Sequence, residues 1–202
     1  MTVLRSSILS LAAASLAAFA MTAAAQDWPS KPIRMIVPYP PGGGTDVVAR
    51  IVNEKLSPEL GQTIVVDNKG GAGGSVGTEL AAKAPSDGYT VLMTLSSHTI
   101  NPKLYTKLSY DVERDFIPVS LAAMIPQIVV AHPSVPASNV QELVALLKAN
   151  PGKFNYASVG SGSPHHLFME ALKAELGLSI QHVPYKGTQA AIPDLLTGGV
   201  QM

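Results

Sequence analysis

Three short loops place glycine beside serine, threonine or aspartate directly before an expected helix, at residues 41–46, 70–75 and 160–163. The first backbone N–H groups of a helix lack an internal partner and carry the positive end of the helix dipole. A carboxylate or phosphate placed there accepts those hydrogen bonds, and glycine lets the backbone approach it closely. Ser96 and Ser97 add hydroxyl donors at a fourth expected helix start. The loops together predict an anion site, although each one alone is equally consistent with an ordinary tight turn.

Other chemistries find less support in the sequence. The chain contains no complete Gly-x-Gly-x-x-Gly or Gly-x4-Gly-Lys-Ser/Thr motif. Nucleophilic catalysis would need Ser161 or Ser163 to pair with a neighbouring histidine, and no motif supports that pairing. His166 and Glu170 could share a metal on one helix face, but a third ligand is not evident. We therefore expect no catalytic residue, no metal site and no cofactor.

Composition narrows the choice of ligand and partner. Lys+Arg and Asp+Glu both number 14, so the net charge is zero, which argues against a nucleic-acid partner. Apolar residues make up 47% and charged residues 14% of the 202 residues, as in a globular protein with a buried core. The absence of cysteine excludes disulfides, thiolate nucleophiles and cysteine-based zinc sites. A bound anion must then be held by local groups.

The first 25 residues have the three parts of a secretory signal peptide. Arg5 gives a positive start, residues 8–21 form an apolar run, and residues 23–25 supply three alanines for cleavage after Ala25. The apolar run is shorter than the roughly 20 residues of a membrane-spanning helix. We expect export to the periplasm and a mature chain that begins at Gln26.

Expected strands and helices alternate along the mature chain. Strands are expected over residues 33–37, 63–66, 90–95, 155–158 and 180–183, and helices over 45–60, 75–84, 139–149, 164–176 and 188–196, with another beginning near residue 96. This alternation predicts an α/β fold with parallel sheets and with ligand groups at the carboxyl ends of the strands. Residues 200–202 look like the start of a further strand, so we expect the sequence to be a fragment.

Finer features of these elements can also be predicted. Thr45 or Asp46 should cap the first helix, Ser138 and Gln141 should form a capping box, and Ser163 should cap a helix that begins at Pro164. Residues 101–115 are expected to be irregular. The apolar residues 116–123 and 127–131 are expected to form crossing strands that lead into a second unit.

An ordered set of motifs resembles the Bug-type solute-binding proteins of tripartite tricarboxylate transporters. The set comprises WPSKPIR (28–34), VPYPPGGGTD (37–46), VDNK (66–69), GAGG (71–74), PSDGYT (85–90), NYAS (155–158), GSGSPHHL (160–167), VPYKG (183–187) and LLTGGV (195–200). The resemblance spans the whole mature chain, although members of the family continue for roughly a hundred residues or more beyond its end.

The resemblance implies a two-lobed periplasmic binding protein fold of type II that is incomplete in its second lobe. The first lobe would span residues 26–115, and the hinge strands and partial second lobe residues 116–202. Such a receptor, expected to be a monomer, captures a di- or tricarboxylate, an acidic amino acid or an aromatic acid and delivers it to membrane permease subunits. A sensing subunit for a membrane signalling kinase stays open as an alternative, and a periplasmic serine hydrolase is a less favoured one.

The resemblance also carries over ligand-binding positions. In the first lobe these are Tyr39, Gly42, Gly43, Gly44, Thr45, Asp46, Ser96 and Ser97, and in the second lobe Ser158, Gly160, Ser161, Gly162 and Ser163, with Thr188 near the rim. Asp46 is equally consistent with a plain helix cap. The two sets of residues are expected to close over the ligand from opposite sides.

Overall fold

The computed structural model describes residues 28–202. The predicted signal peptide and its cleavage site lie outside the described residues. The chain divides into units of residues 1–30 and 31–202, and the second unit contains all the helices and strands described below. No helix within residues 28–202 is both long and apolar enough to cross a membrane.

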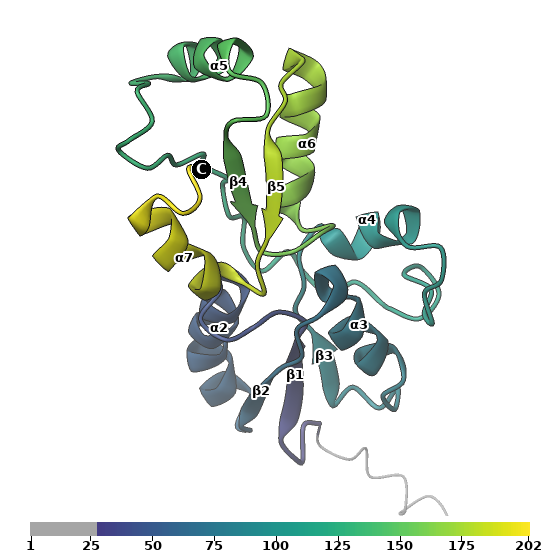
Figure 1. Cartoon of the computed structure of the whole chain (residues 1–202). Helices are drawn as coiled ribbons and strands as arrows, with labels where there is room; N and C mark the ends of the chain where they lie inside the picture. Colours follow the sequence, from purple (N-terminus) through teal and green to yellow (C-terminus); the bar gives the residue numbers. More distant parts are fainter. Residues whose placement is uncertain (1–27) are drawn as a thin grey trace, which may run out of the picture. The chain divides into compact units, whose positions relative to one another are not determined.

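The first sheet is parallel, with strand order β2–β1–β3 (Figure 1). Its strands are β1 (Ile33–Val37), β2 (Ile64–Asn68) and β3 (Thr90–Leu92). Ile33 of β1 lies opposite Ile64 of β2, and Arg34 lies opposite Thr90 of β3. The central strand β1 is almost continuously apolar because both of its faces are buried, as is usual in a parallel sheet.

The helices of this part are α2 (Gly44–Leu60), α3 (Ser75–Ala82) and α4 (Ser97–Leu104), with a 3₁₀ turn η1 (Ala72–Gly74) before α3. Ala49 and Leu60 of α2 pack against Ile33, Met35 and Ile64 in the first core. The predicted cap of α2 is wrong: Gly43 is the cap residue, and Thr45 and Asp46 lie in the first turn of the helix. The prediction that residues 101–104 are irregular is also wrong, since α4 continues past Pro102 to Leu104.

The second sheet is parallel and has two strands, β4 (Asn155–Ser158) and β5 (Gln181–Pro184). It is accompanied by α5 (Val140–Ala149), α6 (Pro164–Leu176) and α7 (Thr188–Thr197) (Figure 1). Leu147 of α5, Tyr156 of β4 and Met169 of α6 meet in a second core. Each sheet therefore has a core of its own.

The helix starts of this part were predicted with mixed success. Ser163 caps α6 as predicted, and its hydroxyl accepts from the backbone N–H of His166 at 3.3 Å. The predicted capping box of α5 is displaced by one residue. Asn139 is the cap, and Glu142 accepts from the backbone N–H of Ser138 at 2.7 Å. Both pairs fit the sequence pattern of a capping box, and the pattern does not distinguish them.

The predicted crossing strands over 116–123 and 127–131 are wrong. The described chain has no strand there, and apolar side chains stand in solvent, including Ile117 and Val119, each 90% exposed. Apolar, β-branched residues form a strand only where a neighbour supplies backbone partners. Backbone pairing with a distant part of the chain begins only after this segment, at His132, whose N–H donates to Gln201 O at 2.9 Å. Residues 200–202 are not a strand either, although Ala157 N donates to Met202 O at 2.7 Å.

Candidate functional site

Each strand of both sheets leads directly into a helix start. β1, β2 and β3 are followed by α2, α3 and α4, while β4 and β5 are followed by α6 and α7. All the predicted ligand-binding residues therefore lie at or just beyond the carboxyl ends of parallel strands, where ligands of such sheets usually bind. The loops of the two sheets also touch. Gln189 Nε2 of α7 donates to Gly42 O at 3.1 Å, and the OH of Tyr105, which directly follows α4, donates to Ser161 O at 3.4 Å.

The loop after β1 is held by the carboxylate of Asp46. One carboxylate oxygen accepts from Gly42 N at 2.9 Å and from Arg50 Nε at 3.0 Å, and the other accepts from Asn68 Nδ2 at 3.0 Å. The hydrogen bond from Arg50 is the main cause that lowers the pKa of Asp46, and Gly42 and Asn68 act in the same direction. This buried, ionised carboxylate occupies the Gly42 amide and thereby shapes the loop.

The start of α2 itself stays open. Gly43 has an extended backbone, and no side chain among residues 28–202 caps the helix. The N–H groups of its first turn, which include those of Gly44 and the buried Thr45, cannot find a partner within the helix. These N–H groups at the start of α2 are the candidate hydrogen-bond donors for a ligand anion in this part of the chain.

The hydroxyls predicted for the first lobe are mostly bound within the protein. Tyr39 OH and Ser97 Oγ are 2.5 Å apart, and both side chains are buried. Asn101 Nδ2 donates to Ser75 Oγ at 3.1 Å and to Gly73 O at 3.2 Å. These bonds attach α4 to the glycine-rich turn before α3. Ser96, by contrast, is exposed.

The loop after β4 also has acceptors of its own. Ser158 Oγ accepts from Gly160 N at 3.1 Å and contacts His182 Nε2 at 2.7 Å. Gly162 N donates to His166 Nδ1 at 3.2 Å. Ser158 and Ser163 are buried, whereas Ser161 is exposed. Of the predicted residues in this loop, Ser161 is therefore the one that presents its groups to solvent, as Thr188 does at the start of α7.

Behind this loop lies a cluster of titratable side chains. The rings of His166 and His182 have centroids 4.2 Å apart, and Tyr156 stacks on His182 at 5.0 Å. Tyr156 OH and Lys173 Nζ both donate to Glu170 Oε1, at 2.6 and 2.7 Å. Burial, followed by the charge that His166 can carry, lowers the pKa of His182. Burial and the neighbouring Glu170 carboxylate raise the pKa of Tyr156.

This cluster does not form the metal or nucleophile arrangements considered from the sequence. His166 Nδ1 and Glu170 Oε1 both have hydrogen-bond donors already, and no three His, Cys, Asp or Glu side chains in the described part of the chain could hold a metal together. Neither Ser161 nor Ser163 forms a hydrogen bond with a histidine ring within residues 28–202. In this cluster it is Ser158, 3% exposed, that contacts a histidine ring.

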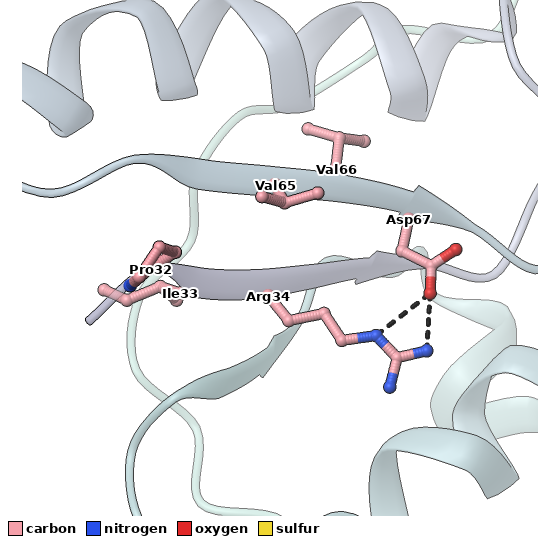
Figure 2. Close-up of a pocket in the computed structure, with 6 residues that line it drawn as sticks. All are labelled: Pro32, Ile33, Arg34, Val65, Val66 and Asp67. Atoms are coloured by element: carbon pink, nitrogen blue, oxygen red, sulfur yellow. Dashed lines mark hydrogen bonds and ion pairs between the residues drawn. The ribbon is translucent and has the colours of Figure 1, made fainter.

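A surface pocket of about 340 Å³ lies elsewhere, over β1 and β2 (Figure 2). It is lined by Pro32, Ile33, Arg34, Val65, Val66 and Asp67. Arg34 Nε donates to Asp67 Oδ2 at 2.9 Å and Lys69 Nζ lies 3.1 Å from Oδ1, so Arg34 and then Lys69 lower the pKa of Asp67. The charged groups at this pocket are thus paired with each other, and the pocket holds none of the predicted ligand residues.

Sequence reasoning missed several residues that shape these loops. Asn101 was assigned to an irregular segment, and His182 to a strand with no role at the site. Gln189 and Tyr105, which join loops of different sheets, were not considered. The partners of these four residues are distant in sequence, so spacing alone gives no indication of the contacts.

Comparison with known proteins decides the family. The model of the tripartite tricarboxylate transporter family receptor matches residues 48–202. The chain belongs to this family. It is 44% identical over 179 residues to the "UPF0065 protein in tcbD-tcbE intergenic region" of Pseudomonas sp. strain P51, covering 87% of this chain and 52% of that protein. It is 40% identical over 186 residues to protein BugT of Bordetella pertussis, covering 91% and 57%.

Solved structures of similar proteins agree with this assignment. Periplasmic binding protein BugD matches with a TM-score of 0.77 at 38% identity, over 86% of this chain and 58% of that one. MatC from Rhodopseudomonas palustris, with bound malate, matches with a TM-score of 0.77 at 30% identity, over 86% and 60%. An R. palustris protein solved with adipate matches with a TM-score of 0.76 at 33% identity, over 86% and 58%.

These comparisons confirm the predicted family and the α/β fold of a periplasmic binding protein. The chain spans about half the length of the curated relatives that it matches. The predicted lobe boundary at residues 115 and 116 and the predicted ligand-binding residues stay predictions.

Proposed function

We propose that this protein is an extracytoplasmic receptor that captures a small carboxylate for the membrane permease of a tripartite transporter. One observation carries the proposal: the open start of α2 and the loop with exposed Ser161 belong to different sheets that touch through Gln189–Gly42 and Tyr105–Ser161. Donors from two sheets can thus reach one ligand. The family, and relatives solved with malate and adipate, support a carboxylate as that ligand.

The chemistry of the loops fits an organic anion. The first-turn N–H groups of α2 and the groups of Ser161 offer hydrogen-bond donors without a fixed positive charge. Asp46, the acidic residue of the first loop, is neutralised by Arg50 at 3.0 Å and therefore repels an incoming carboxylate less. A di- or tricarboxylate, an acidic amino acid or an aromatic acid would each supply the carboxylate.

Capture would proceed by closure without any covalent step. A ligand that bonds to both sheets binds the closed state more tightly than the open one and shifts the population towards it. The protein then acts as a binding protein in the periplasm, not as an enzyme, and its partners are the ligand and the permease subunits.

Substitution at Gly44 tests the proposal directly. Proline at this first helical position keeps the helix but removes one N–H group, and the extended backbone of Gly43 tolerates a following proline. A Cβ at Gly44 meets only Ile125 Cδ1, at an ordinary 3.5 Å, so alanine is a matched control that retains the N–H.

Isothermal titration calorimetry with malate and adipate is the measurement. We expect 1:1 binding without turnover, weakened about tenfold in Gly44→Pro for the loss of one charge-assisted hydrogen bond and about equal to the unchanged chain in Gly44→Ala. Dimethyl adipate, which has no carboxylate, should not bind. Equal affinities in the two variants, or cleavage of the diester, would contradict the proposal.

A further inference from the structure

Two histidines from different elements meet behind the loop after β4. His166 belongs to the first turn of α6 and His182 to β5, and their ring centroids are 4.2 Å apart. Both rings are half-buried. Neither was among the residues predicted to bind the ligand, and neither takes part in the capture step described above.

The hydrogen bonds fix the protonation state of His166. Its Nδ1 lies 3.2 Å from Gly162 N, and a backbone N–H can only donate, so Nδ1 is the acceptor and carries no proton. His166 is therefore neutral, with its proton on Nε2. The tautomer follows from the partner of the ring nitrogen.

His182 reaches the same loop through Ser158. The hydroxyl of Ser158 accepts from Gly160 N at 3.1 Å, and its one proton can go to Gly160 O at 3.1 Å or to His182 Nε2 at 2.7 Å. In either tautomer, His182 is hydrogen-bonded to the hydroxyl that accepts from Gly160. His182 thus acts on Gly160 through Ser158.

The two histidines together control the glycine amides on either side of Ser161. Gly162 is also pressed against α4, since a Cβ there would lie 3.1 Å from Leu104 Cδ1 and 3.5 Å from Asn101 Oδ1. With Gly160 and Gly162 bonded to the cluster, the exposed Ser161 between them is held in one orientation. Its N–H and hydroxyl are the donors that remain for a ligand.

We propose that His166 and His182 are positioning residues that hold this loop so that Ser161 presents its donors to the carboxylate. The inference rests on the proposed function for the identity of the ligand. That the histidines hold the loop is argued from the hydrogen bonds alone. It concerns how the loop is held, and it assigns no contact between the histidines and the ligand.

Charge on His166 would release the loop. An imidazolium carries N–H on both nitrogens and cannot accept from Gly162. The groups that face the pair are Glu170 and Lys173 of α6 and Tyr156 of β4, and the carboxylate and ammonium of the first two lie 2.7 Å apart. These two groups neutralise each other, so the contact of His166 with Gly162 is the one that holds the loop on this side.

Substitutions at His166 separate a positioning role from a merely structural one. In His166→Asn an amide oxygen takes the place of Nδ1, whereas His166→Phe keeps a ring but has no acceptor. His132→Asn, at a histidine that bonds to Ser134 and not to this loop, is the control. The readouts are the histidine tautomers by ¹⁵N NMR, hydrogen exchange of the Gly162 amide, and malate affinity at pH 7.5.

We expect the Nε2–H tautomer at His166 of the unchanged chain. His166→Phe should lose protection at Gly162 and about tenfold in malate affinity, the size of one hydrogen bond. His166→Asn should restore both.

Three results would overturn the inference: a proton on Nδ1 of His166, unchanged Gly162 protection in His166→Phe, or lost protection with unchanged affinity. If His166→Phe does not fold, the tautomers of the unchanged chain and the His166→Asn variant decide. If the unchanged chain binds neither malate nor adipate, the proposed function fails, and the NMR readouts still decide whether the histidines hold the loop.

Discussion

Replacing Asp46 by alanine should lower the free energy of unfolding by about 3 kcal/mol. The buried carboxylate accepts hydrogen bonds from Gly42 N and Asn68 Nδ2, and each bond to an ionised group contributes about 1.5 kcal/mol. The bond to Arg50 adds little, because that guanidinium is 56% exposed and screened by water. Asp46→Asn keeps one acceptor oxygen and should lose about 2 kcal/mol.

Urea unfolding followed by circular dichroism measures this loss. With a slope of about 2 kcal/mol per molar, the midpoint of Asp46→Ala should fall by about 1.5 M. Glu54→Ala, an exposed acid on the same helix, is the control and should change stability by less than about 0.5 kcal/mol. A midpoint for Asp46→Ala within about 0.5 M of the unchanged chain would refute the reasoning that this carboxylate holds the loop.

The same position distinguishes two roles for Asp46. If its carboxylate faced the ligand, it would repel a second carboxylate, so Asp46→Asn would bind malate more tightly. If it holds the loop, the variant should bind malate more weakly, because the Gly42 amide loses its acceptor. The sign of the change in affinity therefore decides between the two roles.

Three further predictions concern stability and solubility. Gly77→Ala places a Cβ 2.6 Å from Lys69 O and should lower the free energy of unfolding by more than about 2 kcal/mol. Gly61→Ala has open space around the Cβ but a φ of +64°, and should lower it by about 1 kcal/mol. Urea unfolding measures both changes. Partial burial lowers the pKa of His98, His165 and His182. As the pH falls below the ordinary histidine pKa of 6.5, the unfolded chain therefore gains protons that these side chains do not gain in the folded chain. Thermal stability should fall by up to about 1.4 kcal/mol per pH unit for each of them. A midpoint independent of pH between 7.5 and 5.5 would contradict this. Lysine at both Ile117 and Val119 should reduce light scattering of concentrated protein and change stability by less than about 0.5 kcal/mol, because both side chains are 90% exposed.

The sequence predicted those elements whose causes are local. The apolar run of β1, the glycine that ends α2 at Gly61, and the Ser163–Pro164 start of α6 all depend on a few adjacent residues. The segment 116–131 was predicted wrongly because a strand depends on a partner, and among residues 28–202 no partner pairs with it. Apolar character was correctly read there, but it does not by itself produce a strand.

The candidate site was predictable in its place and not in its details. Glycine and serine before helix starts correctly indicated the carboxyl ends of the strands. The acceptors that hold the loops come from further away: Asn68 lies on β2, and His182 on β5. These contacts depend on sheet register and helix packing, which a pattern of small residues does not encode.

The loops that should grip an anion are already satisfied in part by the protein itself. Asp46, His166 and Ser158 accept from the amides of Gly42, Gly162 and Gly160. A loop held this way loses little conformational entropy when a ligand binds. The few donors that stay free therefore contribute more of their hydrogen-bond energy to the affinity. Affinity should therefore depend less on the number of glycines than on these internal acceptors. A variant that removes an acceptor should weaken binding even when every atom that touches the ligand is unchanged.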